Sequence, residues 1–524
     1  MPAHTIPAHT IPGVKTDELA RTLDLPRALR DGVVAAGFTV HKVAELLGSE
    51  AHAALSRNET TPGLRRTTGG SPLETLTRLF LLQAVVPLAD AEAALPGLID
   101  RLATEGLIQQ SVGDVAARLD VRPYAADDQD LWVVSDLTPG LDGSPNRVSP
   151  DYVLGINPAS TSLAQLTVRA PVGRSLDLGC GCGVQALHLA RHSESVVATD
   201  VNPRALWITR FNLALNGLAN VEVREGSFFE PVAGEEFDLI ATNPPFVISP
   251  ATGERLVYRD SGIPGDRVVE DIVRLAPRHL NPGGWVQILA NWAIVSGSPW
   301  DERLATWLDG ACDALVVQRE VADPATYVEM WLKDAGLHGG PDYQRRYDTW
   351  LSWFGEQRIE GIGFGWINLR RREGVTVPPQ PSRLDHNVSD PGITMLEFPF
   401  DVEMPVAPAI EGWARGVDAI QCLVDDALLE ARLLVPDDIV QEARGLPGAE
   451  DPVSIVLRQQ RGFRRARQVD TVLAALVGAC DGELSVGQIL DAIAVLLDRP
   501  AAELRAEYPP VVRELLAEGF LVLG

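Results

Sequence analysis

Lysine is nearly absent from this chain, which has three lysines among its 45 basic residues. Arginine therefore carries almost all of the positive charge. Acidic residues number 71, so the net charge is −26. This balance argues against a protein that wraps nucleic acid along its whole surface, because phosphate contacts dominate such binding. It leaves room for a local basic site, and it suits a small molecule or a basic protein as partner.

Cysteine is also scarce, with five residues in 524. The number is odd and no C-x-x-C pair occurs, which argues against a disulfide framework or a zinc site. Cys180 and Cys182 are interpreted as small side chains in a tight turn, and no metal is predicted. No apolar run is long enough to span a bilayer, and no signal peptide is recognised. The sequence therefore predicts a reduced, cytoplasmic protein without a membrane partner.

The length exceeds that of one ordinary domain. Apolar residues at helical spacing, followed by two short runs at 115–122 and 131–135 around a polar turn, predict helices and then a hairpin near the N-terminus. From residue 385 onward, 24 acidic residues face 11 basic ones. The predicted parts are a disordered tail (1–15), a helical, winged-helix-like domain (16–137), a linker (138–150), an α/β domain (151–372), a second linker (373–392) and an acidic, winged-helix-like C-terminal domain (393–524).

The clearest motif is Asp-Leu-Gly-Cys-Gly-Cys-Gly at 177–183. It follows a predicted strand at 172–178 and precedes a predicted helix at 183–192. Strand, glycine-rich turn and helix begin a nucleotide-binding βαβ unit. Glycine lets the backbone approach a ligand where a Cβ would clash, and the helix N-terminus offers unpaired N–H groups to an anion.

A second predicted strand, 195–199, ends in Asp200. An acid about 20 residues after the glycine turn is placed to accept hydrogen bonds from ribose hydroxyls. Asn202 is predicted to cap the next helix, with Pro203 in its first position. A dinucleotide-binding dehydrogenase is the competing interpretation, but its third glycine would come one residue later than it does here.

Two further predicted strands end in polar motifs. Strand 221–223 leads to Ser227 and Phe228, and strand 237–242 ends in Asn-Pro-Pro-Phe at 243–246. At that last motif the sequence resembles the class I S-adenosylmethionine-dependent methyltransferases of the N-P-P-[FY] subgroup, whose members methylate planar or amide nitrogens. The later Pro-Gly-Gly at 282–284 makes the order of motifs similar to the protein-glutamine methyltransferase (HemK-like) family. A dehydrogenase would leave Asn-Pro-Pro-Phe unexplained.

The resemblance implies an α/β, Rossmann-like core with a seven-stranded sheet, and S-adenosyl-L-methionine as cofactor. It places Asp177, Gly179 and Gly181 at the methionine part, Asp200 at the ribose, and Ser227 at the adenine. The implied cofactor-binding residues are Asp177, Gly179, Cys180, Gly181, Asp200, Val201, Asn202, Ser227, Phe228 and Asn243. The implied catalytic residues are Asn243, Pro244, Pro245 and Phe246, and the expected substrate-binding residues are Ser160, Tyr258 and Arg259.

The chemistry explains why Asn243 is needed. An amide or aromatic amine has its lone pair delocalised, and methyl transfer requires that lone pair to lie on the S–CH3 axis. The Asn243 side-chain oxygen and the Pro244 carbonyl can each accept one N–H of an NH2 group. Both hydrogen bonds aim the nitrogen and stabilise the positive charge that grows on it. Prolines stiffen the loop, and Phe246 can stack on a flat acceptor.

Four interpretations of the function remain open, and three of them differ in the methyl acceptor. The first is a protein glutamine side chain, which the acidic composition favours. The second is an exocyclic amine of an RNA base, guanine N2 or adenine N6, reached through the arginines between Arg458 and Arg467; the competing view of that cluster is a solvated helix face that pairs with nearby acids. The third is a small metabolite. The fourth is a binding protein that senses the cofactor without catalysis, against which an intact Asn243 argues.

Overall fold

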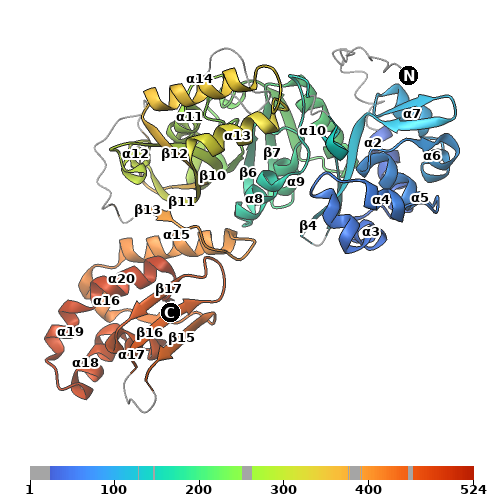
Figure 1. Ribbon diagram of the computed structural model, residues 1–524. Coiled ribbons are helices and arrows are strands. Elements are labelled where there is room, and N and C mark those ends of the chain that lie inside the picture. Colours follow the sequence, from blue (N-terminus) through green and yellow to red (C-terminus); the bar gives the residue numbers. More distant parts are fainter. Residues whose placement is uncertain are drawn as a thin grey trace. The chain divides into compact units, whose positions relative to one another are not determined.

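The computed structural model describes residues 24–127, 129–144, 148–250, 262–375, 377, 390, 392–446 and 452–524. Figure 1 shows helices and strands that alternate through the middle of the chain. The described residues divide into two compact units. The first unit contains the chain up to residue 157 together with 179–231 and 334–336, and the second contains 158–178, 232–333 and 337–524.

An eight-stranded sheet has the order β13-β11-β12-β10-β9-β6-β7-β8. β12 runs antiparallel to both β10 and β11, whereas the pairs β6–β9, β9–β10 and β7–β8 are parallel. The seven strands from β6 to β12 confirm the predicted α/β fold. The strands are β6 (Val172–Leu178), β7 (Ser193–Asp200), β8 (Val221–Glu225), β9 (Phe237–Thr242), β10 (Leu280–Val295), β11 (Cys312–Ala322), β12 (Ile359–Arg371) and β13 (Ile393–Glu397).

The eighth strand differs from expectation. β13 pairs parallel with β11, with Ala314 opposite Ile393. The predicted boundary at residue 393 assigned this segment to the C-terminal domain. A strand of five residues carries a weak sequence signal, because its pairing with β11 is decided by tertiary contacts.

The first unit begins with short helices around a buried apolar cluster. The predicted hairpin is confirmed, with arms at β4 (Leu119–Ala126) and β5 (Gln129–Asp136). α9 (Val184–Leu189) and α10 (Pro203–Leu215) follow the glycine turn and β7. The other elements of the unit are α2 (Asp24–Ala35), α3 (Val40–Leu55), α4 (Thr61–Arg66), α5 (Pro72–Leu76), β1 (Val86–Pro87), α6 (Leu88–Ala94), α7 (Ile99–Thr104), β2 (Ile108–Ser111) and β3 (Asp114–Ala117).

The second unit carries the helices that cover the later strands. α11 packs on β10 and α14 packs on β12, as Figure 1 shows in green and yellow. The N-terminal end of α13 holds Tyr327, which is fully buried. These helices are α8 (Pro158–Leu166), α11 (Arg267–Leu275), α12 (Trp300–Ala305), α13 (Pro324–Asp334) and α14 (Tyr343–Glu356).

The C-terminal module, residues 407–523, surrounds its own apolar cluster. Ser485 and Gln488 form a capping box at the start of α18. Two three-stranded sheets have the orders β18-β14-β19 and β15-β16-β17. The elements are α15 (Ala407–Cys422), α16 (Asp425–Glu430), β14 (Arg432–Leu434), β15 (Ile439–Arg444), β16 (Ser454–Gln459), β17 (Ala466–Val469), α17 (Thr471–Gly478), β18 (Asp481–Ser485), α18 (Val486–Leu496), α19 (Ala501–Glu507), α20 (Pro509–Glu518) and β19 (Val522–Leu523).

A buried carboxylate joins α15 to the large sheet. Asp313, which is 1% exposed, accepts hydrogen bonds from Arg370 and Arg372 at 2.8 Å each, and from Gln421 of α15 at 3.1 Å. Arg370 also donates to Asp418 of α15 at 2.8 Å. Because Trp285, opposite Arg370, lies near the start of β10, the network sits at the amino end of that strand.

Removal of the Asp313 carboxylate is expected to lower the free energy of unfolding. Asp313→Ala leaves the two half-buried guanidiniums of Arg370 and Arg372 without their shared acceptor. Breaking a buried ion pair from one side costs roughly 3 kcal/mol, so the midpoint of chemical unfolding should fall clearly. Asp342→Ala is the control, because it removes an exposed pair with Arg345 and should change the midpoint little. Equal midpoints for the two variants would contradict the role given to Asp313.

Candidate functional site

The glycine turn after β6 has positive φ angles, which residues with a Cβ rarely adopt. φ is +79° at Gly179 and +54° at Gly181. A Cβ built on either residue would meet no described atom within 4 Å. Glycine is therefore required by backbone conformation, and the open space beside it is where a ligand can approach the main chain.

The turn is tied to the end of β7. The N–H groups of Gly179 and Cys180 donate to the carbonyl of Thr199 at 2.9 and 2.8 Å. The N–H of Gly181 donates to one carboxylate oxygen of Asp200 at 2.9 Å, and the N–H of Asn202 donates to the other at 2.9 Å. The Asp200 carboxylate is thereby held across the turn with lone pairs still free to accept hydroxyl groups.

The protonation of Asp200 depends on two opposing effects. Burial raises the pKa of the Asp200 carboxyl, and the N–H donors of Asn202, Gly181 and Val201 lower it. Burial is the larger effect, so the pKa lies above the usual aspartate value. A ligand that hydrogen-bonds to the ionised carboxylate would oppose this shift.

The neighbouring predicted cofactor residues have different surroundings. Asn202 caps α10, with its side-chain oxygen accepting from the Arg204 N–H at 2.9 Å. Val201 is 61% exposed. Phe228, after β8, is half-buried and has a φ of +44°, a strained value for a bulky residue. Ser227 precedes it, and its carbonyl accepts from the Glu230 N–H at 2.9 Å.

In the second unit, Asp177 and the Asn-Pro-Pro-Phe motif belong to paired strands. Asp177 of β6 stands opposite Ala241 of β9 and is 1% exposed. Thr242, the last residue of β9, donates its hydroxyl to the Leu178 carbonyl at 2.8 Å. Asn243 follows directly, so this short bond fixes the point where the motif leaves the sheet.

The side-chain oxygen of Asn243 is buried and has no hydrogen-bond partner among the residues that the structure describes. Leaving a buried amide oxygen unpaired costs about 1–3 kcal/mol. Folded proteins keep few such groups, and functional sites are one place where they occur. An N–H or O–H group of a bound molecule could serve as donor to this oxygen.

An aromatic cluster packs against Phe246, the last residue of the motif. The Phe246 ring lies 6.3 Å from that of Trp331 in an edge-on arrangement, and Trp331 lies 6.0 Å from Tyr327. The Ile248 N–H donates to the Tyr327 hydroxyl at 2.9 Å, and Asn291 donates to the same hydroxyl at 3.3 Å. These supporting residues were not predicted, because their contacts join segments that are distant in the sequence.

Of the expected substrate-binding residues, the structure describes only Ser160. Ser160 is buried on α8. Tyr258 and Arg259 lie outside the described residues. Asp266, just before α11, accepts hydrogen bonds from Arg303 at 2.7 Å and from the Ala293 N–H at 2.8 Å. Its role is therefore structural.

The arginines between 458 and 467 were expected on a helix face, and that expectation is wrong. They lie on β16, β17 and the turn between them, because buried Ile455 and Leu457 alternate with period two. The pairing with acids is confirmed in part. Arg458 donates to Glu442 at 2.8 Å, and Arg467 donates to Glu518 at 2.8 Å.

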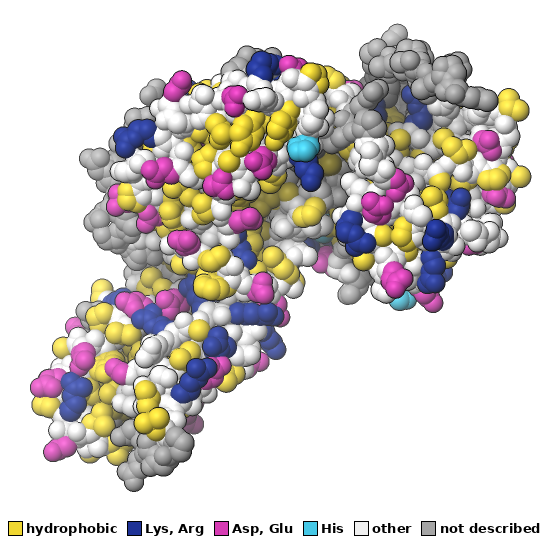
Figure 2. Space-filling view, viewed as in Figure 1, with side chains coloured by type: hydrophobic (Ala, Val, Ile, Leu, Met, Phe, Trp, Pro, Cys, Tyr) yellow, Lys and Arg dark blue, Asp and Glu magenta, His cyan; other side chains and the backbone are white. Residues whose placement is uncertain are grey.

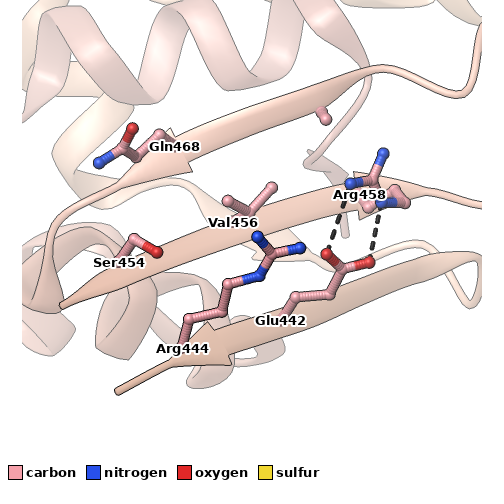
Figure 3. Close-up of a pocket in the computed structure, with 7 residues that line it drawn as sticks. Glu442, Arg444, Ser454, Val456, Arg458 and Gln468 are labelled. Atoms are coloured by element: carbon pink, nitrogen blue, oxygen red, sulfur yellow. Dashed lines mark hydrogen bonds and ion pairs between the residues drawn. The ribbon is translucent and has the colours of Figure 1, made fainter. Parts of the chain in front are cut away.

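The outer face of β15, β16 and β17 carries a shallow groove of about 300 Å3. In Figure 3, Glu442 is joined to Arg458, and Arg444 extends beside them along the same face. Within the described part of the chain, no hydrogen bond or ion pair engages the guanidinium of Arg444, Arg461 or Arg464. The lining residues are Glu442, Arg444, Ser454, Val456, Arg458, Ala466 and Gln468.

The surface around this groove is mixed in charge. Figure 2 shows dark blue basic side chains beside magenta acidic ones over the C-terminal module. The groove itself is lined by two arginines and one glutamate, with Arg458 paired to Glu442, so it is only slightly basic. Separately, in the described ranges no helix is long and apolar enough to cross a membrane.

Comparison with known proteins identifies a similarity in the middle of the chain. Residues 155–298 match a family described as the methyltransferase small domain. Residues 35–118 and 412–523 match two domain families of unknown function. The matched middle segment contains both the glycine turn and the Asn-Pro-Pro-Phe motif.

Two kinds of curated relative are similar to this segment. One is a release factor glutamine methyltransferase of Xylella fastidiosa, 37% identical over 131 residues, which are 23% of this chain and 47% of the relative. Another is a ribosomal RNA small subunit methyltransferase C of Idiomarina loihiensis, 33% identical over 160 residues, which are 30% of this chain and 42% of the relative. The chain thus spans about half the length of the curated relatives it matches.

Solved structures show a more distant likeness. A 16S rRNA N2 G1207 methyltransferase of T. thermophilus, in complex with AdoMet and guanosine, is 19% identical and covers 41% of this chain and 58% of its own, with a TM-score of 0.26.

Proposed function

We propose, from the premise that this chain contains a class I S-adenosylmethionine-dependent methyltransferase domain, that it transfers a methyl group to an amide or amine nitrogen and that this nitrogen belongs to a protein glutamine. The observation that carries the proposal is the buried, unpaired side-chain oxygen of Asn243. It supports an acceptor that brings an N–H group, since such a donor would satisfy this oxygen.

The residues of the glycine turn fit the cofactor. At Gly179 and Gly181 the space that a Cβ would occupy is open, so main chain can approach the methionine part. The Asp200 carboxylate, held by two N–H groups, would accept the ribose hydroxyls. Exposed Val201 and half-buried Phe228 offer apolar surface for the adenine. S-adenosylmethionine, when bound, supplies an electrophilic methyl group on a sulfonium sulfur.

Asn243 and Pro244 would orient the acceptor. The Asn243 side-chain oxygen and the Pro244 carbonyl would each accept one N–H, which fixes the plane of the NH2 group and aims its lone pair, perpendicular to that plane, at the methyl carbon. The same two oxygens would stabilise the positive charge that develops on nitrogen. As the nitrogen takes the methyl group and the sulfur keeps the electron pair of the broken S–CH3 bond, the nitrogen would lose its extra proton to water. Because Phe246 is packed against Trp331, the flat acceptor group meets a fixed ring.

An acidic chain favours a basic protein as the substrate. The net charge of −26 repels phosphate over most of the surface and attracts a basic partner. The release factor methyltransferase named among the relatives supports the glutamine, although it shares only part of its length with this chain.

The decisive experiment is transfer of labelled methyl groups from S-adenosylmethionine to an extract of the native host, with nuclease or protease added. Label that survives nuclease and is lost with protease supports a protein acceptor, and mapping the labelled residue tests glutamine. Label lost with nuclease would overturn the protein proposal in favour of RNA. Label that resists both enzymes and stays small would indicate a metabolite.

The second candidate acceptor is an exocyclic amine of an RNA base, guanine N2 or adenine N6. It is favoured by the groove arginine Arg444 and by Arg461 and Arg464, whose guanidiniums form no hydrogen bond or ion pair with the described residues. It is also consistent with the ribosomal RNA methyltransferases among the relatives.

A charge variant tests this second candidate. If RNA is the substrate, Arg444→Gln should weaken its binding by a few-fold and make the salt dependence shallower by about one unit of slope. Arg499→Gln is a control, since Arg499 is paired with Glu507 at 2.9 Å on another face of the module. A salt dependence that does not change between the wild type and Arg444→Gln would argue against an RNA contact in the groove.

A further inference from the structure

Two asparagines one turn apart on α10 join this helix to the hairpin strand β5. The Asn216 side chain accepts from the Trp132 N–H at 3.0 Å and donates to the Trp132 carbonyl at 2.7 Å. The Asn212 side chain accepts from the Val134 N–H at 2.7 Å and donates to the Val134 carbonyl at 2.8 Å. Each amide thus pairs with one strand residue as a neighbouring strand would.

The spacing explains why two such pairs form. Four residues of a helix rise about 6 Å, and two residues of a strand extend about 6.8 Å. Asn212 therefore matches Val134, and Asn216 matches Trp132, on the free edge of β5. Both asparagines are buried, at 0% and 9% exposed, so these bonds satisfy groups that water cannot reach.

Of the two asparagines, only Asn212 also forms a hydrogen bond with the glycine turn. Its NH2 group also donates to the Cys182 carbonyl at 2.8 Å. One turn earlier on the same helix, Thr209 donates its hydroxyl to the Gly181 carbonyl at 3.0 Å. Two successive carbonyls of the turn are thus held by side chains of α10, which fixes the peptide planes of the turn that is proposed to bind the cofactor.

We infer that Asn212 is a positioning residue, which holds the Cys182 carbonyl while it pairs with β5 and so couples the N-terminal hairpin to the cofactor turn. The inference rests on the proposed function, since it gives the turn that role. It assigns the N-terminal hairpin a part in cofactor affinity, in addition to any contact with substrate. Thr209 acts on the same turn without touching the hairpin.

The test compares Asn212→Ala with Asn216→Ala, because both variants lose the same kind of pair with β5 and only the first loses the bond to Cys182. Binding of S-adenosylhomocysteine, the demethylated product, is measured by calorimetry in the full chain, at a temperature where each variant remains folded. We expect both variants to melt at lower temperature. The dissociation constant should rise about tenfold in Asn212→Ala and less than twofold in Asn216→Ala.

Thr209→Val and Thr209→Ser test separately whether a side chain of α10 that holds a carbonyl of the turn affects cofactor binding. Valine removes the hydroxyl that holds the Gly181 carbonyl, and serine restores it. We expect weaker binding by a few-fold in Thr209→Val and near wild-type binding in Thr209→Ser. Equal affinity in all variants would overturn the inference, whereas a wild-type protein that binds no S-adenosylhomocysteine would overturn the proposed function itself.

Discussion

Asn243→Ala should retain cofactor binding while kcat falls by about 100- to 1,000-fold. The variant removes one of the two oxygens proposed to orient the acceptor nitrogen and to stabilise its growing charge. Loss of one such preorganised group typically costs this much in kcat. Because the side-chain oxygen is buried and unpaired among the described residues, its removal should also leave the free energy of unfolding unchanged or slightly raised.

The matched control is Asn281→Ala. Asn281 lies near the start of β10 and donates to Asp238 at 2.7 Å, so the same chemical change occurs away from the motif. It should reduce stability and leave kcat close to that of the wild type. Turnover is measured with labelled S-adenosylmethionine, and binding with S-adenosylhomocysteine. If Asn243→Ala turns over at the wild-type rate, the proposed mechanism fails even if the cofactor assignment holds.

The strands β6 and β7 were predictable because each leads directly into residues with a special backbone requirement. Gly179 and Gly181 need positive φ, and Asn202 caps α10 with Pro203 in its first position. These are local rules that a sequence expresses directly. β13 was assigned to another domain because its place depends on pairing with β11, which no local pattern encodes.

The arginines near the C-terminus show a different kind of failure. Their closeness along the chain suggested one charged helix face. The structure divides them between strands, with Arg458 on the outer face and Arg467 paired to Glu518 of α20. Buried apolar residues at every second position were the signal for strands, and counting them would have changed the prediction.

Contacts between distant segments were beyond sequence reasoning. Asn212 and Asn216 stand four residues apart on a helix that is otherwise largely buried. That pattern marks buried polar groups that need partners, but the partners on β5 are about 80 residues away in the chain. The aromatic support of Phe246 by Trp331 is likewise a tertiary contact.

Asp200→Ala should weaken binding of S-adenosylmethionine by about 10- to 100-fold. A carboxylate that accepts two ribose hydroxyls contributes charge-assisted hydrogen bonds, which are stronger than neutral ones. The same carboxylate also receives the N–H groups of Gly181 and Asn202, so its loss frees the turn as well. Glu225→Gln is the control, because Glu225 ends the adjacent strand β8 and is exposed. It should bind within about twofold of the wild type.

The pH dependence of cofactor binding distinguishes the contribution of the Asp200 charge from that of the side-chain shape. Ribose hydroxyls donate to the ionised form, so affinity should be highest above the pKa of Asp200 and fall as the pH drops through it. Because burial raises that pKa, the loss should begin at a higher pH than for an ordinary aspartate. Asp200→Asn keeps the shape without the titration, and its affinity should be low and independent of pH in this range. A wild-type affinity that stays constant from neutral pH down to the ordinary aspartate pKa would show that the carboxylate does not bind the ribose.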